Sequence, residues 1–356
     1  MNRIAKISLK VLKWVGIGIL SLIVLFLLVR WTGQGVNKRT PKGGINKSMY
    51  VDINGTKQWI SIYGQDKGNP VLLYLHGGPG QATSLYDYAF TRKWSDVYTV
   101  VTWDQRACGK SYDKSHPETI ITSEIMMSDG KAITEFLRDY LQVEKITLLG
   151  HSWGSYFGAN LALAYPEYYA AFIGTGQFID KDENERRLYE AALKWSENDP
   201  EGREMVEKWG ASIGTGEEDA HLRHAIMKRY NLGMTKDEPD YNVTATVFFN
   251  PYYSLRETMA FIKRLNEGNK EYASFWTSDD FNEMSLMGRY DYAMPYYNIN
   301  GDVDYQTNYS LACEYFERVN APKKQMFVMK NATHGLLETR SEEFSGYLHQ
   351  IGLSHP

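Results

Sequence analysis

The residues whose chemistry stands out are Gly150-His151-Ser152-Trp153-Gly154, a serine placed between two glycines in a G-x-S-x-G pattern. They follow the apolar run Ile146–Leu149 and precede a segment with helical spacing, which predicts a strand, a sharp turn and a helix. A serine on such a turn lies at the N-terminus of the helix, where the dipole stabilises developing negative charge. Because glycine has no Cβ atom, Gly150 and Gly154 let the strand and the helix approach closely. The pattern therefore predicts that Ser152 is a nucleophile.

A serine hydroxyl needs a base, and behind a turn of this kind the chain order is serine, acid, histidine. His221 and His224 lie in a charged helical stretch, and His349 and His355 lie in the terminal helix and the tail. His334 instead follows the last apolar strand directly, at the carboxyl edge of the sheet where ligands bind. We predict that His334 is the base.

The acid is expected in the loop after the preceding strand, where Gly301-Asp302-Val303-Asp304 offers two carboxylates. Asp302 follows the tight turn at Gly301 immediately, and an aspartate in that position usually stabilises the turn. Asp304 lies beyond the turn. We predict Asp304 as the acid, with the role of fixing the tautomer of His334 and stabilising its protonated form.

Attack by serine on a carbonyl carbon creates an oxyanion, which needs backbone N–H donors. One donor is expected from Trp153, the residue after the nucleophile, and the other from the loop that follows the early strand Val71–Leu75. That loop is His76-Gly77-Gly78-Pro79-Gly80, and Pro79 has no N–H to donate. The predicted oxyanion donors are therefore Gly78 and Trp153.

The elements that must position these residues can be read from the apolar runs. Asn54-Gly55 between two short alternating segments, Ser48–Ile53 and Lys57–Tyr63, predicts a hairpin with a tight turn. Near-continuous apolar runs, of the kind buried on both faces of a parallel sheet, then alternate with stretches of helical spacing. The predicted strands are Val71–Leu75, Val97–Trp103, Ile146–Leu149, Ala170–Ile173, Tyr296–Ile299 and Gln325–Met329, and the helices between or after them Asp129–Leu141, Tyr156–Tyr165 and Glu342–Ile351. This alternation predicts a mostly parallel, doubly wound α/β sheet.

The rhythm stops after Gln177, where charged helical stretches such as Glu183–Glu197 and Leu255–Asn266 replace the parallel strands. We expect a core formed by residues 48–177 and 286–356, interrupted by a helical cap over residues 178–285. Aromatic residues are frequent in this insertion and are candidates for the wall of an apolar pocket or for ordinary core. They include Trp195, Trp209, Phe248, Phe249, Tyr252, Tyr253 and Trp276.

The charges of the chain are unevenly distributed. The first 47 residues hold nine of the 39 Lys and Arg residues and none of the 43 Asp and Glu residues, so the remainder carries a formal charge near −13. An acidic body offers no basic face for phosphates, which argues against nucleic-acid binding. Two cysteines are too few for a disulfide framework, and no spacing around them suggests metal ligands.

The N-terminal segment predicts a membrane anchor over residues 1–31. Trp14–Val29 is uncharged and is framed by Lys13 and Arg30, and Trp14 and Trp31 suit the two membrane interfaces. A cleaved signal peptide is the alternative, but no small-residue cleavage site follows the apolar run. The early cations favour a cytoplasmic N-terminus and an extracytoplasmic catalytic domain on a single-pass cell-membrane protein. Residues 32–47, rich in Gly, Lys and Asn, are expected to be a polar tether.

Taken together, these motifs resemble the proline iminopeptidase family of α/β hydrolases, also called prolyl aminopeptidases or peptidase family S33. The resemblance is carried by His76-Gly77-Gly78-Pro79-Gly80, by Asp104-Gln105-Arg106-Ala107-Cys108-Gly109-Lys110-Ser111 and by the motif around Ser152, in the order of the family. It extends from about Ser48 to the C-terminus. The family usually has glycine where Ala107 stands.

The resemblance implies an α/β-hydrolase fold and an enzyme that removes N-terminal residues, often proline, from short peptides without a metal or organic cofactor. It also implies acidic cap residues that bind the free amine of the substrate. Glu185 is the candidate for that role and Glu183 its rival, although a solvated acid on a charged helix is an equally good interpretation of either.

The sequence is therefore compatible with three functions. The leading one is a serine aminopeptidase acting on small peptides. A carboxylesterase or amidase acting on another small apolar substrate is the second, and a non-catalytic, membrane-tethered binding protein that has kept the fold is the third.

Overall fold

The computed structural model describes residues 3–115, 120–213, 217–232, 234 and 237–353. Residues 1–2 of the predicted anchor, 116–119 and 354–356 of the predicted core, and a few positions of the predicted cap lie outside this range, as does His355.

One sheet organises the described part of the chain, and its eight strands run in the order β1-β2-β4-β3-β5-β6-β7-β8. The hairpin β1–β2 and the pair β2–β4 are antiparallel, and all other neighbours are parallel. The strands are β1 (Ile45–Ile53), β2 (Thr56–Gly64), β3 (Val71–Leu75), β4 (Thr99–Asp104), β5 (Ile146–His151), β6 (Tyr169–Thr175), β7 (Tyr296–Gly301) and β8 (Lys324–Met329). The predicted doubly wound α/β fold is confirmed, and the predicted strands are displaced by no more than a few residues at their ends.

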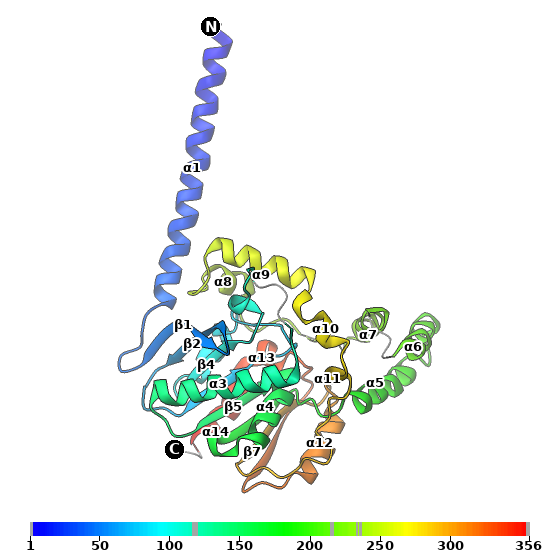
Figure 1. The fold of residues 1–356 in the computed structure, drawn as a ribbon. Helices are drawn as coiled ribbons and strands as arrows, with labels where there is room; N and C mark the ends of the chain where they lie inside the picture. The colour runs from blue at the N-terminus through cyan, green and yellow to red at the C-terminus, as the bar shows by residue number, and fades with distance from the viewer. Residues whose placement is uncertain (1–2, 116–119, 214–216, 233, 235–236, 354–356) are drawn as a thin grey trace.

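Helices cover both faces of this sheet (Figure 1). α3 (Ser123–Leu141), α4 (Trp153–Ala164) and α12 (Tyr309–Arg318) bury their apolar sides in one core with β3 and β5. On the other face, α14 (Ser341–Leu353) packs with the short helices α2 (Tyr88–Thr91) and α13 (Leu336–Thr339). The central strands are buried from end to end because apolar side chains on both faces meet helices.

The segment between β6 and β7 is helical, as its charged periodic sequence predicts. Its helices are α5 (Lys181–Trp195), α6 (Pro200–Ser212), α7 (Glu217–Arg229), α8 (Val243–Phe248), α9 (Leu255–Glu267), α10 (Ala273–Trp276) and α11 (Asp279–Asn282). α5, α6 and α7 form a small core of their own around Leu188, Val206 and Trp209. They lie to one side of the sheet, whereas α8 and α9 lie above the strand ends near α1 (Figure 1).

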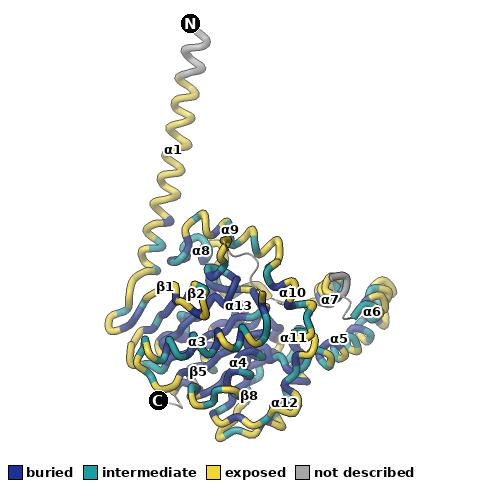
Figure 2. Tube along the Cα trace, in the orientation of Figure 1, coloured by how far each residue is buried: buried dark blue, intermediate teal, exposed yellow. Residues whose placement is uncertain are grey.

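The N-terminal helix α1 (Arg3–Asn37) projects away from the rest of the molecule, and its described side chains are almost all exposed (Figures 1 and 2). An 18-residue window within its segment Lys10–Asn37 has a mean hydropathy of 2.5, so the segment is long and apolar enough to cross a membrane, a property that a signal sequence would share.

The predicted polar tether over residues 32–47 is wrong in its extent, because α1 continues to Asn37 and β1 already begins at Ile45. The composition of this stretch favours coil, but its polar side chains have partners in the insertion. Gln34 donates to the carbonyl oxygens of Asn250 and Tyr253, and Asn37 donates to that of Phe249. These bonds hold the last turns of the helix against the folded domain.

A buried ion pair joins the β1–β2 hairpin, α3 and the loop after β4. Arg106 donates through Nε and Nη2 to the two carboxylate oxygens of Asp129, at 2.6 and 2.7 Å. Gln58 and Asn54 also donate to this carboxylate, which is fully buried. Every oxygen of the carboxylate is therefore satisfied, and the guanidinium has its counter-charge.

We predict that Asp129→Ala lowers the free energy of unfolding by about 3–5 kcal/mol, because it leaves the buried Arg106 charge without a partner. Denaturant titration of the full chain in detergent measures the change. Asp52→Ala, which removes an exposed partner of Lys57, is the matched control and should cost less than about 1 kcal/mol. Equal losses of unfolding free energy in the two variants would show that the buried Arg106–Asp129 pair has no special effect on stability.

Candidate active site

Ser152 lies in a strained turn between β5 and α4. Its backbone angles are φ 56° and ψ −124°, which a side-chain-bearing residue rarely adopts. A Cβ atom on Gly150 would overlap the backbone of Gly154, and one on Gly154 would overlap the carbonyl of Leu75. Both positions therefore require glycine for the strand, turn and helix to meet, as the sequence pattern predicts.

The turn is held from two sides. The Ser152 N–H donates to the carbonyl oxygen of Thr175 at 3.0 Å, at the end of the neighbouring strand β6. Ser155 donates to the Ser152 carbonyl oxygen through both its N–H and its hydroxyl. The Ser152 side chain itself is only half-buried, so a substrate can reach it, and it stands at the N-terminus of α4.

Asp304 and His334, which lie in two different loops, are in direct contact. His334 Nδ1 lies 2.8 Å from Asp304 Oδ2, and both side chains are 1 % exposed. Asp304 Oδ1 accepts the N–H groups of Gln306 and Thr307, and the Thr307 hydroxyl donates to Oδ2. This carboxylate is therefore fixed in direction, and it fixes the imidazole with Nδ1 as the donor and Nε2 turned away.

His334 lies at the same edge of the sheet as Ser152. Gly176 directly follows Thr175, the residue of β6 whose carbonyl oxygen accepts the Ser152 N–H. A Cβ atom at Gly176 would lie 2.8 Å from His334 Cε1. The His151 ring, directly before Ser152, lies 4.7 Å from that of His334, and His151 Nε2 donates to the His334 carbonyl oxygen at 3.0 Å. Within the described residues, His334 Nε2 is buried without a hydrogen-bond partner. In enzymes without bound substrate, hydrogen bonds between catalytic groups are often long or poorly aligned, so this geometry leaves His334 a candidate base.

Asp302, the other carboxylate of that loop, has a different place. Its Oδ1 accepts the N–H of Asn331 at 2.6 Å, and Lys330 Nζ lies 3.4 Å from its Oδ2. Asp302 therefore joins the turn after β7 to the turn after β8, and only Asp304 contacts the imidazole.

The loop after β3 borders the serine. A Cβ on Gly77 would lie 3.1 Å from the Ser152 Cβ, and Gly78 has φ 121°, a value that only glycine adopts readily. Gly78 and Trp153, the predicted oxyanion donors, thus belong to the two segments that adjoin the Ser152 side chain.

Gln105 connects these two segments, although the sequence does not mark it as a site residue. Its Nε2 donates to the His76 carbonyl oxygen at 3.3 Å, and its Oε1 accepts the indole N–H of Trp153 at 3.3 Å. Only the position of Gln105 within the motif Asp104–Ser111, which carries the family resemblance, could have indicated this role. Ala107 in the same motif has φ 58°, so the turn forms with alanine where the family usually has glycine.

Two buried histidines beside the site, His76 and His151, are held in their neutral form. His76 Nδ1 lies 2.8 Å from the Gly77 carbonyl oxygen, and its Nε2 accepts the Gln105 N–H at 3.3 Å, so Nε2 must keep its lone pair. Burial lowers the pKa of His76 to about 4. Burial, together with the neighbouring His334, lowers the pKa of His151 to about 3.

Glu185, the predicted partner of a substrate amine, is buried and already has a cation. Its carboxylate lies 2.8 Å from Arg223 Nε and 4.0 Å from Lys181 Nζ. Its rival Glu183 is bound by Arg186 and Arg187 on the same helix. The structure therefore argues against both as free anions that await a substrate amine.

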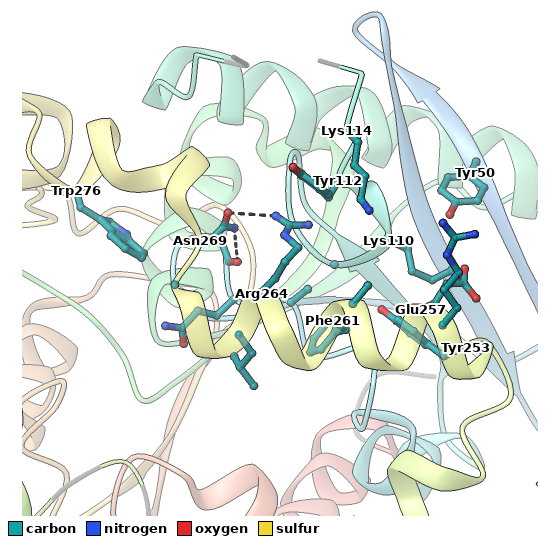
Figure 3. Close-up of a pocket in the computed structure, with 18 residues that line it drawn as sticks. Tyr50, Lys110, Tyr112, Lys114, Tyr253, Glu257, Phe261, Arg264, Asn269 and Trp276 are labelled. Atoms are coloured by element: carbon teal, nitrogen blue, oxygen red, sulfur yellow. Dashed lines mark hydrogen bonds and ion pairs between the residues drawn. The ribbon is translucent and has the colours of Figure 1, made fainter. Parts of the chain in front are cut away.

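A cavity of about 390 Å³ lies between α9 and the loop around Lys110 (Figure 3). Gly80 from the loop after β3 and Trp276 from α10 are on its wall, and Lys110 pairs with Glu257 farther along it. Ser152 and His334 are not among the described residues that line it. Of the aromatic residues proposed for a pocket, Tyr253 and Trp276 line this cavity, whereas Trp209 belongs to the core of α5–α7.

Known proteins resemble this chain in sequence. A profile of the α/β hydrolase fold matches residues 70–341. A probable aminopeptidase of Bacillus subtilis is 25 % identical over 290 residues, which cover 80 % of this chain and 89 % of the relative. A proline iminopeptidase of Neisseria gonorrhoeae is 32 % identical over 147 residues, covering 40 % of this chain and 44 % of that protein.

Solved structures share the fold at lower identity. A proline iminopeptidase of Mycobacterium smegmatis superposes with a TM-score of 0.62 at 20 % identity, covering 87 % of this chain and 100 % of its own. A membrane phospholipase A described as a bacterial virulence factor superposes with a TM-score of 0.59 at 16 % identity and covers 99 % of this chain and 98 % of its own.

The lowered pKa of His76 predicts a loss of stability in acid. Between its ordinary pKa of 6.5 and its folded value of about 4, the unfolded chain binds a proton that the folded chain does not. Folding stability from this group is thus complete above pH 6.5 and falls as the pH drops toward 4. We expect the stability of the wild type relative to His76→Gln to fall by about 2 kcal/mol between pH 7.5 and pH 5.

Urea titrations of both proteins at the two pH values measure this difference. Buried carboxyls such as Asp104, whose pKa burial raises to about 7, titrate in both proteins and cancel. His224→Gln, at an exposed position of α7, is the control and should leave the difference near zero. A difference between wild type and His76→Gln that does not change with pH would show that His76 is not held neutral by its surroundings.

Proposed function

Because the chain belongs to the α/β-hydrolase fold family, we propose that it is a serine hydrolase, and more narrowly an aminopeptidase that releases N-terminal residues, preferably proline, from short peptides. The observation that carries the hydrolase proposal is the buried contact between His334 Nδ1 and Asp304 Oδ2, beside the strained turn that presents Ser152. The narrower activity is supported by the names of the relatives, an aminopeptidase and a proline iminopeptidase.

In the proposed mechanism, Ser152 Oγ attacks the carbonyl carbon of the scissile bond and His334 Nε2 takes the hydroxyl proton. Asp304 keeps the imidazole in the required tautomer and stabilises its charged form. The oxyanion accepts the N–H groups of Gly78 and Trp153, which Gln105 holds in relation to each other.

The imidazolium then protonates the leaving amine as the C–N bond breaks, which leaves an acyl-enzyme on Ser152. A water molecule attacks this ester with His334 again as the base. The acid is released, the proton returns to Ser152, and the enzyme is regenerated. Each group needed for these steps is a side chain or backbone amide, so the proposal includes no cofactor.

A carboxylesterase or amidase activity on a small apolar substrate is the second candidate. The ion pair between Glu185 and Arg223 favours it, because the predicted amine-binding carboxylate already has its counter-charge. An ester substrate needs no anionic partner, and it would use the same nucleophile, base and oxyanion donors.

We also propose that α1 is a membrane anchor rather than a cleaved signal, with the catalytic domain on the extracytoplasmic side. The proposal is supported by contacts beyond the apolar run Trp14–Val29. Arg30 is 4 % exposed and donates to carbonyl oxygens of Phe248 and Tyr253. Removal of a signal peptide behind its apolar run would cut through this helix and discard its contacts.

We predict that Ser152→Ala lowers the hydrolytic rate by about 10⁴-fold or more and abolishes labelling by a fluorophosphonate, because both need the serine oxygen. Asp304→Asn should lower kcat by about 10³- to 10⁴-fold, since an amide cannot hold the same histidine tautomer.

Steady-state kinetics with the purified full chain measures both effects. Asp302→Asn is the matched control, because it keeps an acceptor for the Asn331 N–H and should retain most of the activity. Unchanged hydrolysis and labelling in Ser152→Ala would exclude this serine as the nucleophile. Absence of activity in the wild type toward all ester and amide substrates would favour a binding protein.

The two enzymatic candidates differ in their demand for a free amine. We expect a prolyl arylamide to be cleaved faster than its N-acetylated form and faster, in kcat/KM, than a short-chain aryl ester. Parallel assays with the three substrates under one set of conditions make the comparison. Preference for the ester, or equal cleavage of free and acetylated arylamides, would reject the aminopeptidase and support the esterase.

A further inference from the structure

Helix α9 has two chemically different faces. The inward face, with Glu257, Phe261 and Arg264, lines the cavity described above. The outward face carries Met259 and Ile262, which are 70 % and 41 % exposed. These two residues lie three positions apart, so they form one apolar stripe on the surface of the helix.

A contact between α1 and α8 fixes how deep α8 and α9 lie relative to the apolar run of α1. The ring of Phe26, inside the apolar run Trp14–Val29, lies 4.8 Å from the ring of Phe248 at the end of α8. Phe26 precedes the end of that run by three residues, or about 4.5 Å along a helix. If α1 crosses a bilayer, Phe248 therefore reaches the level of the hydrocarbon.

Polar contacts make this arrangement specific. The buried Arg30 guanidinium donates to the Tyr253 carbonyl oxygen at 2.8 Å and to the Thr258 hydroxyl at 3.4 Å. Thr258 is on α9 itself, so the anchor is joined directly to the helix that carries the apolar stripe. Gly33 gives the Phe249 ring the space to pack on α1, because a Cβ there would overlap that ring.

The charges beside the stripe suit a lipid surface. Lys263 is exposed on α9, and Lys38, Arg39 and Lys42 are exposed at the foot of α1, whereas Arg256 is exposed but lines the cavity. Of the two acids on α9, Glu257 is paired with Lys110, and Glu267 lies 3.7 Å from Lys263 in a pair whose two side chains are largely exposed and which contributes little. Cations around an apolar stripe are typical of helices that lie in the headgroup region of anionic membranes.

We propose that the outward face of α9, formed by Met259 and Ile262 with Lys263 beside them, lies in the headgroup region of the anionic bilayer that α1 spans. The proposal rests on the anchor proposed above, but not on the reaction. α8 and α9 lie along the edge of the domain from which α1 departs, to one side of the lower end of α1 (Figure 1). One helix thus separates the membrane surface from the cavity, and the cavity lies directly beneath the membrane.

The depth of α9 can be measured with the full chain in nanodiscs of phosphatidylcholine and phosphatidylglycerol. A cysteine at position 262 (Ile262→Cys), in a Cys313→Ser background that keeps the buried Cys108, is labelled with a nitrobenzoxadiazole fluorophore. With lipids brominated on the acyl chains, we expect the label to lose at least about half of its fluorescence, and Met259→Cys should behave in the same way. Glu317→Cys, on α12 far from α1, is the control and should be unaffected (Figure 1).

Three other outcomes would overturn the proposal. A label at position 262 that brominated lipid spares and aqueous iodide quenches would place α9 in water. Protection from both quenchers, with cross-linking between two Ile262→Cys chains, would make the face an interface between copies of the chain. Release of the full chain from membranes by alkaline carbonate would reject the anchor and the surface with it, while hydrolysis by Ser152, assayed in detergent, would remain unaffected.

Discussion

The close approach of β5, the Ser152 turn and α4 is the constraint on which the site depends. The backbone at Ser152 is forced to φ 56°, and no side chain fits at Gly150 or Gly154 without overlapping backbone atoms. Strain of this kind persists only when the surroundings determine it. Here the surroundings are the parallel register of β3, β5 and β6, since the Ser152 N–H binds the last residue of β6 and Gly154 packs on the last residue of β3.

A second layer of polar contacts carries this constraint to the other chemical groups. Gln105 joins the loop after β3 to the Trp153 side chain, and the neighbouring Arg106 is held by Asp129 on α3. The loops after β7 and β8 are joined twice, through Asp302 to the Asn331 N–H and through Asp304 to His334. Apart from the exposed bond between Asp302 and Asn331, these groups are buried, so each needs its partner and the loops are held in one arrangement.

The N-terminal helix is connected to the folded domain more closely than its sequence indicates. Arg30 ends the apolar run, a position in which a cation is expected to extend toward headgroups. Instead it is buried against the segment between α8 and α9, whose carbonyl oxygens it satisfies. α1 and the insertion thus form one unit, and the orientation of the insertion relative to α1 is set by hydrogen bonds rather than by a flexible connection.

Local sequence determined much of the fold because its signals are local. Apolar runs between turn residues locate the strands, Asn54-Gly55 locates the hairpin, and the glycines around Ser152 locate the strained turn, since each depends only on neighbouring side chains and backbone angles. The order of Ser152, Asp304 and His334 along the chain could also be read from the sequence. Their candidate roles follow from residue type and from the strand ends that they succeed.

Tertiary structure decided what residue type leaves open. Asp302 and Asp304 are the same residue type in one loop, and although the turn at Gly301 favoured Asp304, it is packing that brings one to the imidazole and the other to the Asn331 amide. Glu185 resembled a free carboxylate until folding placed Arg223 beside it. The stretch 32–47 has the composition of a coil, yet side-chain bonds to carbonyls more than two hundred residues away extend the helix to Asn37. In each case the deciding partner is distant in the chain, so its effect on energy exists only once the fold has brought the two groups together.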